Sequence, residues 1–215
     1  MVRLIYYLDV LSSWCFFTEP ALARVRERFG DRISYEWRIA WGDGGPANYT
    51  PEQMAWFYRR SGSITGVELN PAWLRSREDG SHWADLAAEA ARELGCSDDR
   101  VRLALARTCL VEGRRLVERE AATEVAAAAG GLERAALARA MDDPAIEARL
   151  RGWAHEFKAM GATQRPTFVL RNGIDDVTML SGNFRYEPLA ACVQAMLDDE
   201  EGYRAFEASN EPMPA

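Results

Sequence analysis

The sequence lacks most of the features that identify a metal-binding or disulfide-stapled protein. It has only two histidines, and its four cysteines, Cys15, Cys96, Cys109 and Cys192, form no C-x-x-C pair. Zinc sites need cysteine or histidine ligands at close spacing, and disulfide scaffolds need more cysteine in a shorter chain. We therefore predict no metal site and four reduced thiols, of which Cys109 and Cys192 read as core residues.

Long apolar runs and an excess of positive charge are also missing. No segment is continuously apolar over about 18 residues, the length that a membrane span requires. Near the start of the chain, Asp9 interrupts the apolar run that a signal peptide would need. The 33 acidic residues outnumber the 26 basic ones, which gives a net charge of −7. We therefore expect a cytoplasmic protein that binds neither a membrane nor nucleic acid.

Apolar and aromatic residues are plentiful, and their spacing predicts the first elements. Of the 215 residues, 48% are hydrophobic, which is enough for an ordinary buried core. Residues 3–10 form an apolar run typical of a buried strand, residues 14–29 have helical periodicity, and residues 32–40 alternate as a second strand. A strand, a helix and a strand in succession predict a βαβ unit with two parallel strands.

Strand signals nearly vanish in the middle of the chain. We predict helices over residues 51–60, 81–94, 98–112 (capped by Ser97), 117–128, 132–141 and 144–160. Strand character then returns at 167–171 and 177–180, with Asn172-Gly173 as a typical hairpin turn. An amphipathic helix over 187–197 closes the chain, and an exposed extension follows it.

This order predicts an α/β fold, a thioredoxin-like core (βαβ…ββα) with an all-helical insertion. Residues 1–48 would form the first part of the core and residues 49–160 the helical insertion. Residues 161–215 would form the second part of the core and the C-terminal helix.

The first segment that can carry chemistry is Ser12-Ser13-Trp14-Cys15, where the first strand leads into the first helix. Backbone N–H groups and the helix dipole favour an anion at such a position. A cysteine there can be a nucleophile with a lowered pKa. Alternatively, the serines only cap the helix and Cys15 packs as a small apolar residue. This segment leaves both interpretations open.

The second segment is Arg165-Pro166, directly before a predicted core strand. Proline there removes a hydrogen-bond donor from the strand ladder. A cis peptide bond in a tight turn is one arrangement that accommodates it, and a trans proline at the strand start is the other. In a thioredoxin-like core, this segment and the first one would be neighbours.

Together these features resemble the DsbA-like thioredoxin superfamily. The resemblance rests on the run from Tyr7 to Cys15 (YLDVLSSWC), the helical insertion and the run RPTFV that begins at Arg165. The superfamily includes disulfide oxidoreductases, 2-hydroxychromene-2-carboxylate isomerases and kappa-class glutathione transferases. Its oxidoreductases carry C-x-x-C at the helix start, commonly with Trp before the second Cys, as Trp14 precedes Cys15 here.

The glutathione-dependent branch carries D-x-x-S-P-Y-S at the same place. Asp9 and Ser12 match this pattern, whereas Ser13 replaces its proline and Cys15 its second serine. A dithiol cycle is excluded at this position unless another cysteine comes close, because Ser12 cannot form a disulfide. Of the other three cysteines, Cys96 is the hardest to dismiss.

The resemblance implies glutathione or another low-molecular-weight thiol as cofactor. Its sulfur would face Ser12, and Ser13, Trp14 and Pro166 would line the ligand. Another thiol remains open, because the Ser-Asp pair that holds the γ-glutamyl end of glutathione in kappa-type enzymes is replaced by Asn183 and Phe184.

The favoured function is therefore small-thiol-dependent isomerisation or transfer on an apolar or aromatic small molecule. Ser12 would activate the thiol, Cys15 would pack or react secondarily, and Arg165 and Asn183 would meet anionic groups. The first alternative is a monothiol disulfide oxidoreductase that uses Cys15, and the second is a non-catalytic thioredoxin-fold binding protein. The apolar helices of the insertion leave room for a homodimer.

Overall fold

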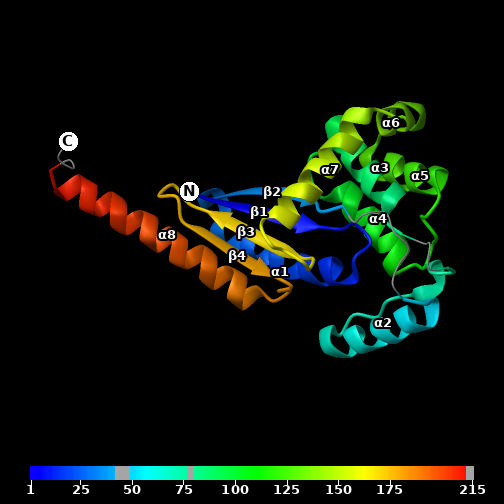
Figure 1. Cartoon of the computed structure of the whole chain (residues 1–215), viewed down its shortest axis with the longest axis horizontal. Helices are drawn as coiled ribbons and strands as arrows, with labels where there is room; N and C mark the ends of the chain where they lie inside the picture. Colours follow the sequence, from blue (N-terminus) through cyan, green and yellow to red (C-terminus); the bar gives the residue numbers. More distant parts are fainter. Residues whose placement is uncertain (42–48, 77–79, 212–215) are drawn as a thin grey trace.

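A computed structural model, which describes residues 1–41, 49–76 and 80–211, contains a four-stranded mixed sheet in the order β2-β1-β3-β4 (Figure 1). The strands are β1 (Val2–Leu8), β2 (Ile33–Ile39), β3 (Thr167–Arg171) and β4 (Val177–Ser181). β1 and β2 pair in parallel, and the other two pairs are antiparallel. Helix α1 (Ser13–Phe29) connects the parallel strands, as predicted.

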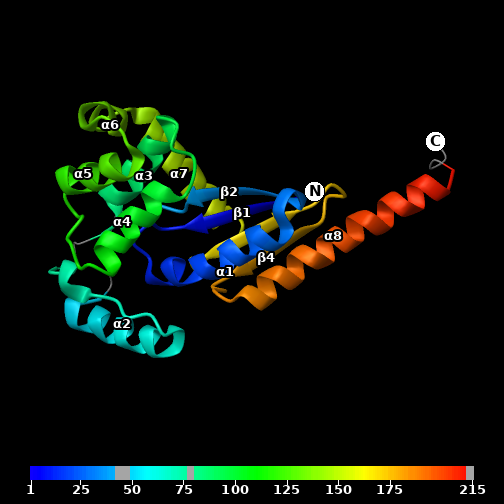
Figure 2. The same ribbon diagram turned by 180° about the vertical axis from the view of Figure 1, so that it is seen from behind.

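Helices cover both faces of the sheet. α1 and α8 (Tyr186–Ser209) lie on one face, and α7 (Pro144–Ala159) lies on the other (Figures 1 and 2). Because side chains alternate along a strand, neighbours in β1 pack against different layers. The Tyr6 ring stacks on Phe168 in the α1 layer, with centroids 4.9 Å apart, whereas Tyr7 contacts Phe157 of α7.

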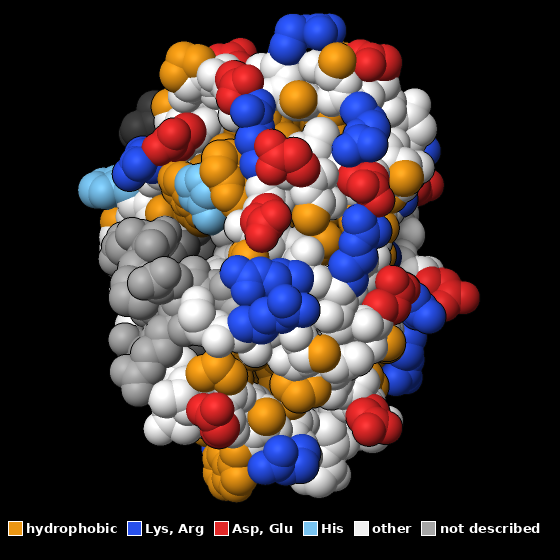
Figure 3. All heavy atoms as spheres, turned by 90° about the vertical axis from the view of Figure 1, so that its right-hand side faces the viewer, with side chains coloured by type: hydrophobic (Ala, Val, Ile, Leu, Met, Phe, Trp, Pro, Cys, Tyr) orange, Lys and Arg blue, Asp and Glu red, His pale blue; other side chains and the backbone are white. Residues whose placement is uncertain are grey.

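The region between β2 and β3 is helical, and the fold class is the predicted one. Its helices are α2 (Pro51–Thr65), α3 (His82–Glu93), α4 (Arg100–Leu110), α5 (Arg119–Gly130), α6 (Arg134–Met141) and α7, with a short 3-10 turn at Pro71–Trp73; another such turn, Gly30–Arg32, joins α1 to β2. The N-cap of α4 is Asp99, so the predicted Ser97 cap is wrong. None of the described helices is long and apolar enough to span a membrane. On the face formed by the helical end, acidic and basic side chains are interspersed (Figure 3).

A buried ion-pair network joins the helical part to the core. Arg102 of α4 is only 4% exposed, and its guanidinium donates to both carboxylate oxygens of Glu19 in α1, at 2.6 and 3.0 Å. The same guanidinium binds Asp99 at 2.7 Å and the Tyr35 hydroxyl of β2 at 3.2 Å. Helices α1 and α4 are thereby fixed relative to each other.

Two predictions near the C-terminus are corrected. The β3–β4 turn spans residues 172–176 rather than two residues, because the Asn172 side-chain oxygen accepts the N–H groups of Ile174 and Asp176. Asp175, not Gly173, takes the left-handed conformation, at φ 65°. α8 continues to Ser209 rather than ending near residue 197, so most of the expected extension is helical.

Candidate functional site

The candidate site begins at the N-terminus of α1, directly after β1. The Ser12 hydroxyl oxygen caps the helix by accepting the Cys15 N–H at 3.4 Å, and the Ser12 carbonyl accepts the Phe16 N–H at 3.0 Å. The turn before the helix is held by Asp9, whose side chain accepts the Leu11 N–H at 2.9 Å. Because the cap uses the Ser12 oxygen as an acceptor, the hydroxyl proton can still be donated to a sulfur atom, either that of Cys15 or that of a ligand.

Two further donors lie beside this hydroxyl. The backbone N–H groups of Ser13 and Trp14 make no hydrogen bond to another described residue. They belong to the first turn of a 17-residue helix, where N–H groups are left over and the dipole is positive. The helix start can therefore bind an anion such as a thiolate.

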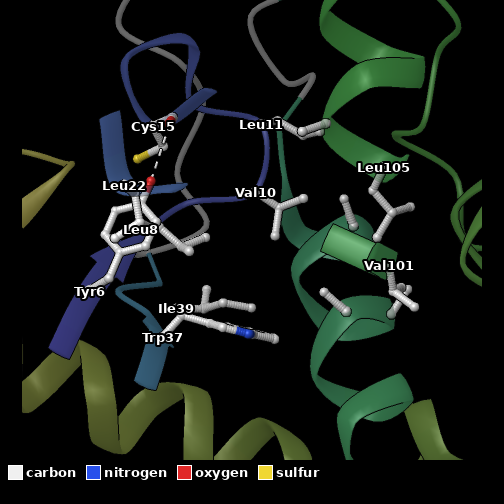
Figure 4. Close-up of a cluster of buried hydrophobic side chains, with 14 of the residues drawn as sticks. Tyr6, Leu8, Val10, Leu11, Cys15, Leu22, Trp37, Ile39, Val101 and Leu105 are labelled. Carbon is white, nitrogen blue, oxygen red and sulfur yellow. Dashed lines mark hydrogen bonds between the residues drawn. The ribbon is translucent and has the colours of Figure 1, made fainter. Parts of the chain in front are cut away.

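Cys15 lies inside the fold. Its side chain is 3% exposed and sits in the hydrophobic cluster beside Tyr6, whose hydroxyl donates to the Cys15 carbonyl at 3.2 Å (Figure 4). Burial raises the pKa of the Cys15 thiol to about 11, against the opposing effect of the hydrogen bond with Ser12. At pH 7 the thiol is almost entirely protonated, which makes it a weak nucleophile.

The remaining cysteines form no disulfide with Cys15, since all four thiols are free. Cys109 is fully buried, as its apolar context suggested, whereas Cys192 is only half-buried. Cys96 is 3% exposed, and its sulfur lies 3.5 Å from the Gly130 carbonyl at the end of α5. These contacts place Cys96 in the helical packing.

The Arg165–Pro166 bond is cis, one of the two conformations that the sequence left open. Tyr7 pairs with Thr167 in the sheet, so Pro166 lies beside the end of β1, where the turn into α1 begins. The Pro166 carbonyl accepts the Gly182 N–H at 2.8 Å. The two predicted segments are therefore neighbours.

The residues directly before α8 pack against the start of α1. The Phe184 ring packs on Trp14 with centroids 5.1 Å apart. Phe184, which replaces the aspartate of kappa-type enzymes, therefore makes an aromatic contact instead. The Asn183 side-chain oxygen accepts the Arg185 N–H at 2.8 Å. Asn183 is therefore near the α1 start, with its acceptor engaged in the local turn.

The Arg165 side chain has a fixed partner. It is half-buried, and its guanidinium donates to the Ala40 carbonyl at the end of β2, at 2.6 Å. The positive charge is thus held across the carboxyl edge of the parallel strands. Trp41, which follows Ala40 in the chain, stacks on His82 of α3 with centroids 5.1 Å apart. Burial lowers the pKa of His82, which favours a neutral imidazole.

A buried carboxyl group that the sequence did not identify lies behind the turn. Asp85 of α3 is fully buried and accepts the Val10 N–H at 3.0 Å. The Ser81 hydroxyl lies 2.7 Å from Asp85 and 3.0 Å from Asp9. The Ser81 hydroxyl has one proton and can donate it to only one of the two carboxylates. Burial, together with the charge of Asp9, raises the pKa of Asp85 well above its ordinary value. The protonated form of Asp85 is therefore favoured. The one available signal was an acid among the alanines and leucine of residues 84–88.

Fold and site together define a thioredoxin-fold protein with a cis-proline beside a helix N-terminus. The chain belongs to the DSBA-like thioredoxin domain family, whose model matches residues 3–194. The neighbouring solved structures include oxidoreductases of this type. No curated protein matches the sequence.

Three solved structures are informative. The cytosolic disulfide reductase DsbM from Pseudomonas aeruginosa is similar with a TM-score of 0.72 and 23% identity, over 94% of this chain and 99% of that one. DsbM with GSH is similar with a TM-score of 0.70 and 23% identity, over 93% and 99%. A probable DsbA oxidoreductase from Streptomyces coelicolor is similar with a TM-score of 0.72 and 19% identity, over 100% of this chain and 94% of that one. At these identities the likeness establishes the fold.

Proposed function

We propose that the protein is a small-thiol-dependent isomerase or transferase that acts on an apolar or aromatic small molecule. The observation that carries the proposal is the contrast at the start of α1. Ser12 is half-buried beside the cis-proline, and its hydroxyl proton is not used by the helix cap, whereas Cys15 is buried with a raised pKa. The chain's own thiol is poorly suited to attack, but the helix start suits the sulfur of a bound thiol.

The sulfur end of a glutathione-like cofactor fits the residues present. The Ser12 hydroxyl and the N–H groups of Ser13 and Trp14 would stabilise a thiolate, and the backbone beside the Arg165–Pro166 bond would meet its peptide part. When bound, the cofactor supplies the thiolate nucleophile that the chain lacks. The presence of GSH in a DsbM structure supports this class of cofactor.

The γ-glutamyl end fits less well, because no acid stands within the Ser181–Arg185 stretch to meet its ammonium group. Weak binding of glutathione, or preference for a thiol without that amine, is therefore expected. His82, which is half-buried and stacks on the buried Trp41, and the half-buried Arg165 offer an aromatic ring and a cation to a substrate with an apolar body and a carboxylate. The likeness to the cytosolic DsbM supports a cytoplasmic location.

Two variants at the helix start test the proposal. Ser12→Ala removes a charge-assisted hydrogen bond to the sulfur and is expected to lower glutathione-dependent isomerisation or conjugation by about 10- to 100-fold. Cys15→Ala is expected to retain most of the activity once its fold is checked by circular dichroism. The opposite pattern, loss with Cys15→Ala and retention with Ser12→Ala, would establish the Cys15 alternative instead.

Thiol labelling separates the remaining alternatives. With Ellman's reagent at pH 7, the native protein should leave Cys15 unmodified, and denaturation should release four reactive thiols. Rapid labelling of native Cys15 contradicts the proposal. A thermal-shift series with glutathione, cysteine and their S-methyl forms completes the test, since a non-catalytic binding protein would distinguish none of the free thiols from the blocked ones.

A further inference from the structure

The end of α8 projects beyond the rest of the protein. The helix has 24 residues, and its contact with the core ends at Glu200, which binds the Met1 amino group and the Gly173 N–H. From Glu201 onward every described residue is exposed, and Figures 1 and 2 show this segment extending past the sheet. We call residues 201–211 the α8 tail.

The tail carries two large aromatic side chains without cover. Tyr203 is 61% exposed and Phe206 is 65% exposed. Because they are three residues apart on a helix, they lie on neighbouring positions of its surface. A short helical segment without tertiary contacts is marginally stable in water, and clustered exposed aromatic residues mark an interaction surface. The tail therefore needs an apolar partner.

A groove of suitable shape lies on the first half of the same helix, beside α1. The Arg28 side chain from α1 borders it and donates to the Tyr186 hydroxyl at 3.1 Å. We call this feature the α1–α8 groove; its α8 residues are Tyr186, Glu187, Ala190, Ala191, Gln194, Ala195 and Asp198. The three alanines leave room for larger side chains from another molecule.

Charge identifies the occupant more closely. The tail contains Glu201, Glu207 and Glu211 against one cation, Arg204. At the groove, Arg28 forms no ion pair with a described residue, and neither does Arg24, whose guanidinium lies over the Tyr186 ring. An anionic membrane surface repels the acidic tail, whereas Arg24 and Arg28 attract it, against the opposing charges of Glu187 and Asp198, which also line the groove.

The groove and the tail also lie on one face of one helix. Side chains three, four or seven residues apart lie on the same side of a helix. This spacing relates Ala191, Ala195, Gly202 and Phe206. When two copies of α8 run antiparallel, the tail of each therefore lies over the groove of the other. A twofold dimer requires such a self-complementary surface.

We propose that the protein forms a twofold-symmetric homodimer in which the α8 tail of each copy lies in the α1–α8 groove of the other. Phe206 packs on Ala191 and Ala195 of the second copy, and Glu207 approaches its Arg28. The two reciprocal contacts cover the exposed aromatic residues. The dimer depends on α8 and α1, not on the helical insertion.

Sedimentation equilibrium from 1 to 100 µM tests the dimer. The wild type should reach twice the chain mass of 24.1 kDa. Phe206→Glu in the tail and Ala191→Glu in the groove should each raise the dissociation constant at least about tenfold, a loss of 1.4 kcal/mol. Both positions are exposed, so circular dichroism should show an intact fold. Ile64→Glu, at an apolar position of α2 that is 53% exposed, is the matched control and should leave the dimer intact.

A charge exchange tests the pairing itself. Arg28→Glu should weaken the dimer, and adding Glu207→Arg to the same chain should restore it. A wild type that stays monomeric at 100 µM overturns the proposal, and so does a dimer that both Phe206→Glu and Ala191→Glu leave intact. The thiol-dependent activity is measured separately on the same variants, so failure of the dimer and failure of the proposed function are distinguishable.

Discussion

Two buried polar clusters connect the helical part to the core, and they differ in how their charges are balanced. In the first, Arg102 binds Glu19 and Asp99. In the second, Ser81 joins Asp85 to Asp9. The cation that acts on Asp85 is Arg165, whose guanidinium is engaged by the Ala40 carbonyl.

The difference distinguishes a structural junction from a group that is poised for chemistry. A buried ion pair with complete hydrogen bonding keeps its charge at every ordinary pH. A buried acid beside a second carboxylate keeps a proton instead, and such perturbed groups concentrate at functional sites. The second cluster touches the β1–α1 turn directly through Val10 and Asp9. Figure 4 shows Val10 and Leu11 of this turn facing Leu105 of α4.

The largest effect is expected from Arg102→Met. This change leaves Glu19 and Asp99 without their shared cation in a buried setting and should cost about 3–5 kcal/mol of unfolding free energy. Urea denaturation measures it. Arg100→Met on the same helix is the control, since Arg100 is more than half exposed and its ion pair with Asp98 should contribute less than about 1 kcal/mol. Equal losses in the two variants would remove the distinction between the clusters.

The second prediction concerns Asp85→Asn, which copies the protonated acid. The folded-state pKa of Asp85 is raised above the unfolded value, so the contribution of Asp85 to wild-type stability is fully present below about pH 4 and is lost as the pH rises toward the folded-state pKa. Asp85→Asn lacks this loss of stability, so its unfolding free energy should increase relative to that of the wild type as the pH rises. Each unit of pKa difference contributes about 1.4 kcal/mol.

Thermal unfolding between pH 4 and 9 measures the difference between the two proteins. Asp85→Ala is the matched variant, because it removes the charge together with the acceptor of the Val10 N–H. It should be less stable than Asp85→Asn at every pH. A constant difference between wild type and Asp85→Asn across this range would mean that Asp85 is ionised throughout, and the contrast with the Arg102 cluster would fail.

The pattern of apolar residues predicts much of the fold, because most elements bury one regular face. β1, α1 and β2 lie within two residues of the predicted ranges, since Leu22, Val25 and Phe29 repeat along one helix face. The C-terminal half of α8 was missed for the opposite reason. Its residues Asp198–Glu201 interrupt the apolar stripe, and every described residue beyond them is exposed.

The candidate site was predictable only where a residue stands at the boundary of a predicted helix or strand. Ser12 and Pro166 were found because each stands at the edge of an element. Asp85 was not, because its partner Val10 is 75 residues away and a lone acid in a helix usually faces water. Arg102, which pairs with a carboxylate 83 residues away, is hidden for the same reason.

The smallest effect is expected from Tyr35→Phe in the Arg102 cluster. The Tyr35 hydroxyl donates to Asp99 at 3.2 Å and accepts from Arg102 at 3.2 Å, but both partners keep their mutual ion pair without it. Its loss should cost about 1 kcal/mol in urea denaturation, equally at pH 5 and pH 8, because no charge changes in that range. A loss that depends on pH would mean that the Arg102 cluster exchanges a proton, as Asp85 does. A loss as large as that of Arg102→Met would mean that the hydroxyl, rather than the guanidinium, holds the junction together.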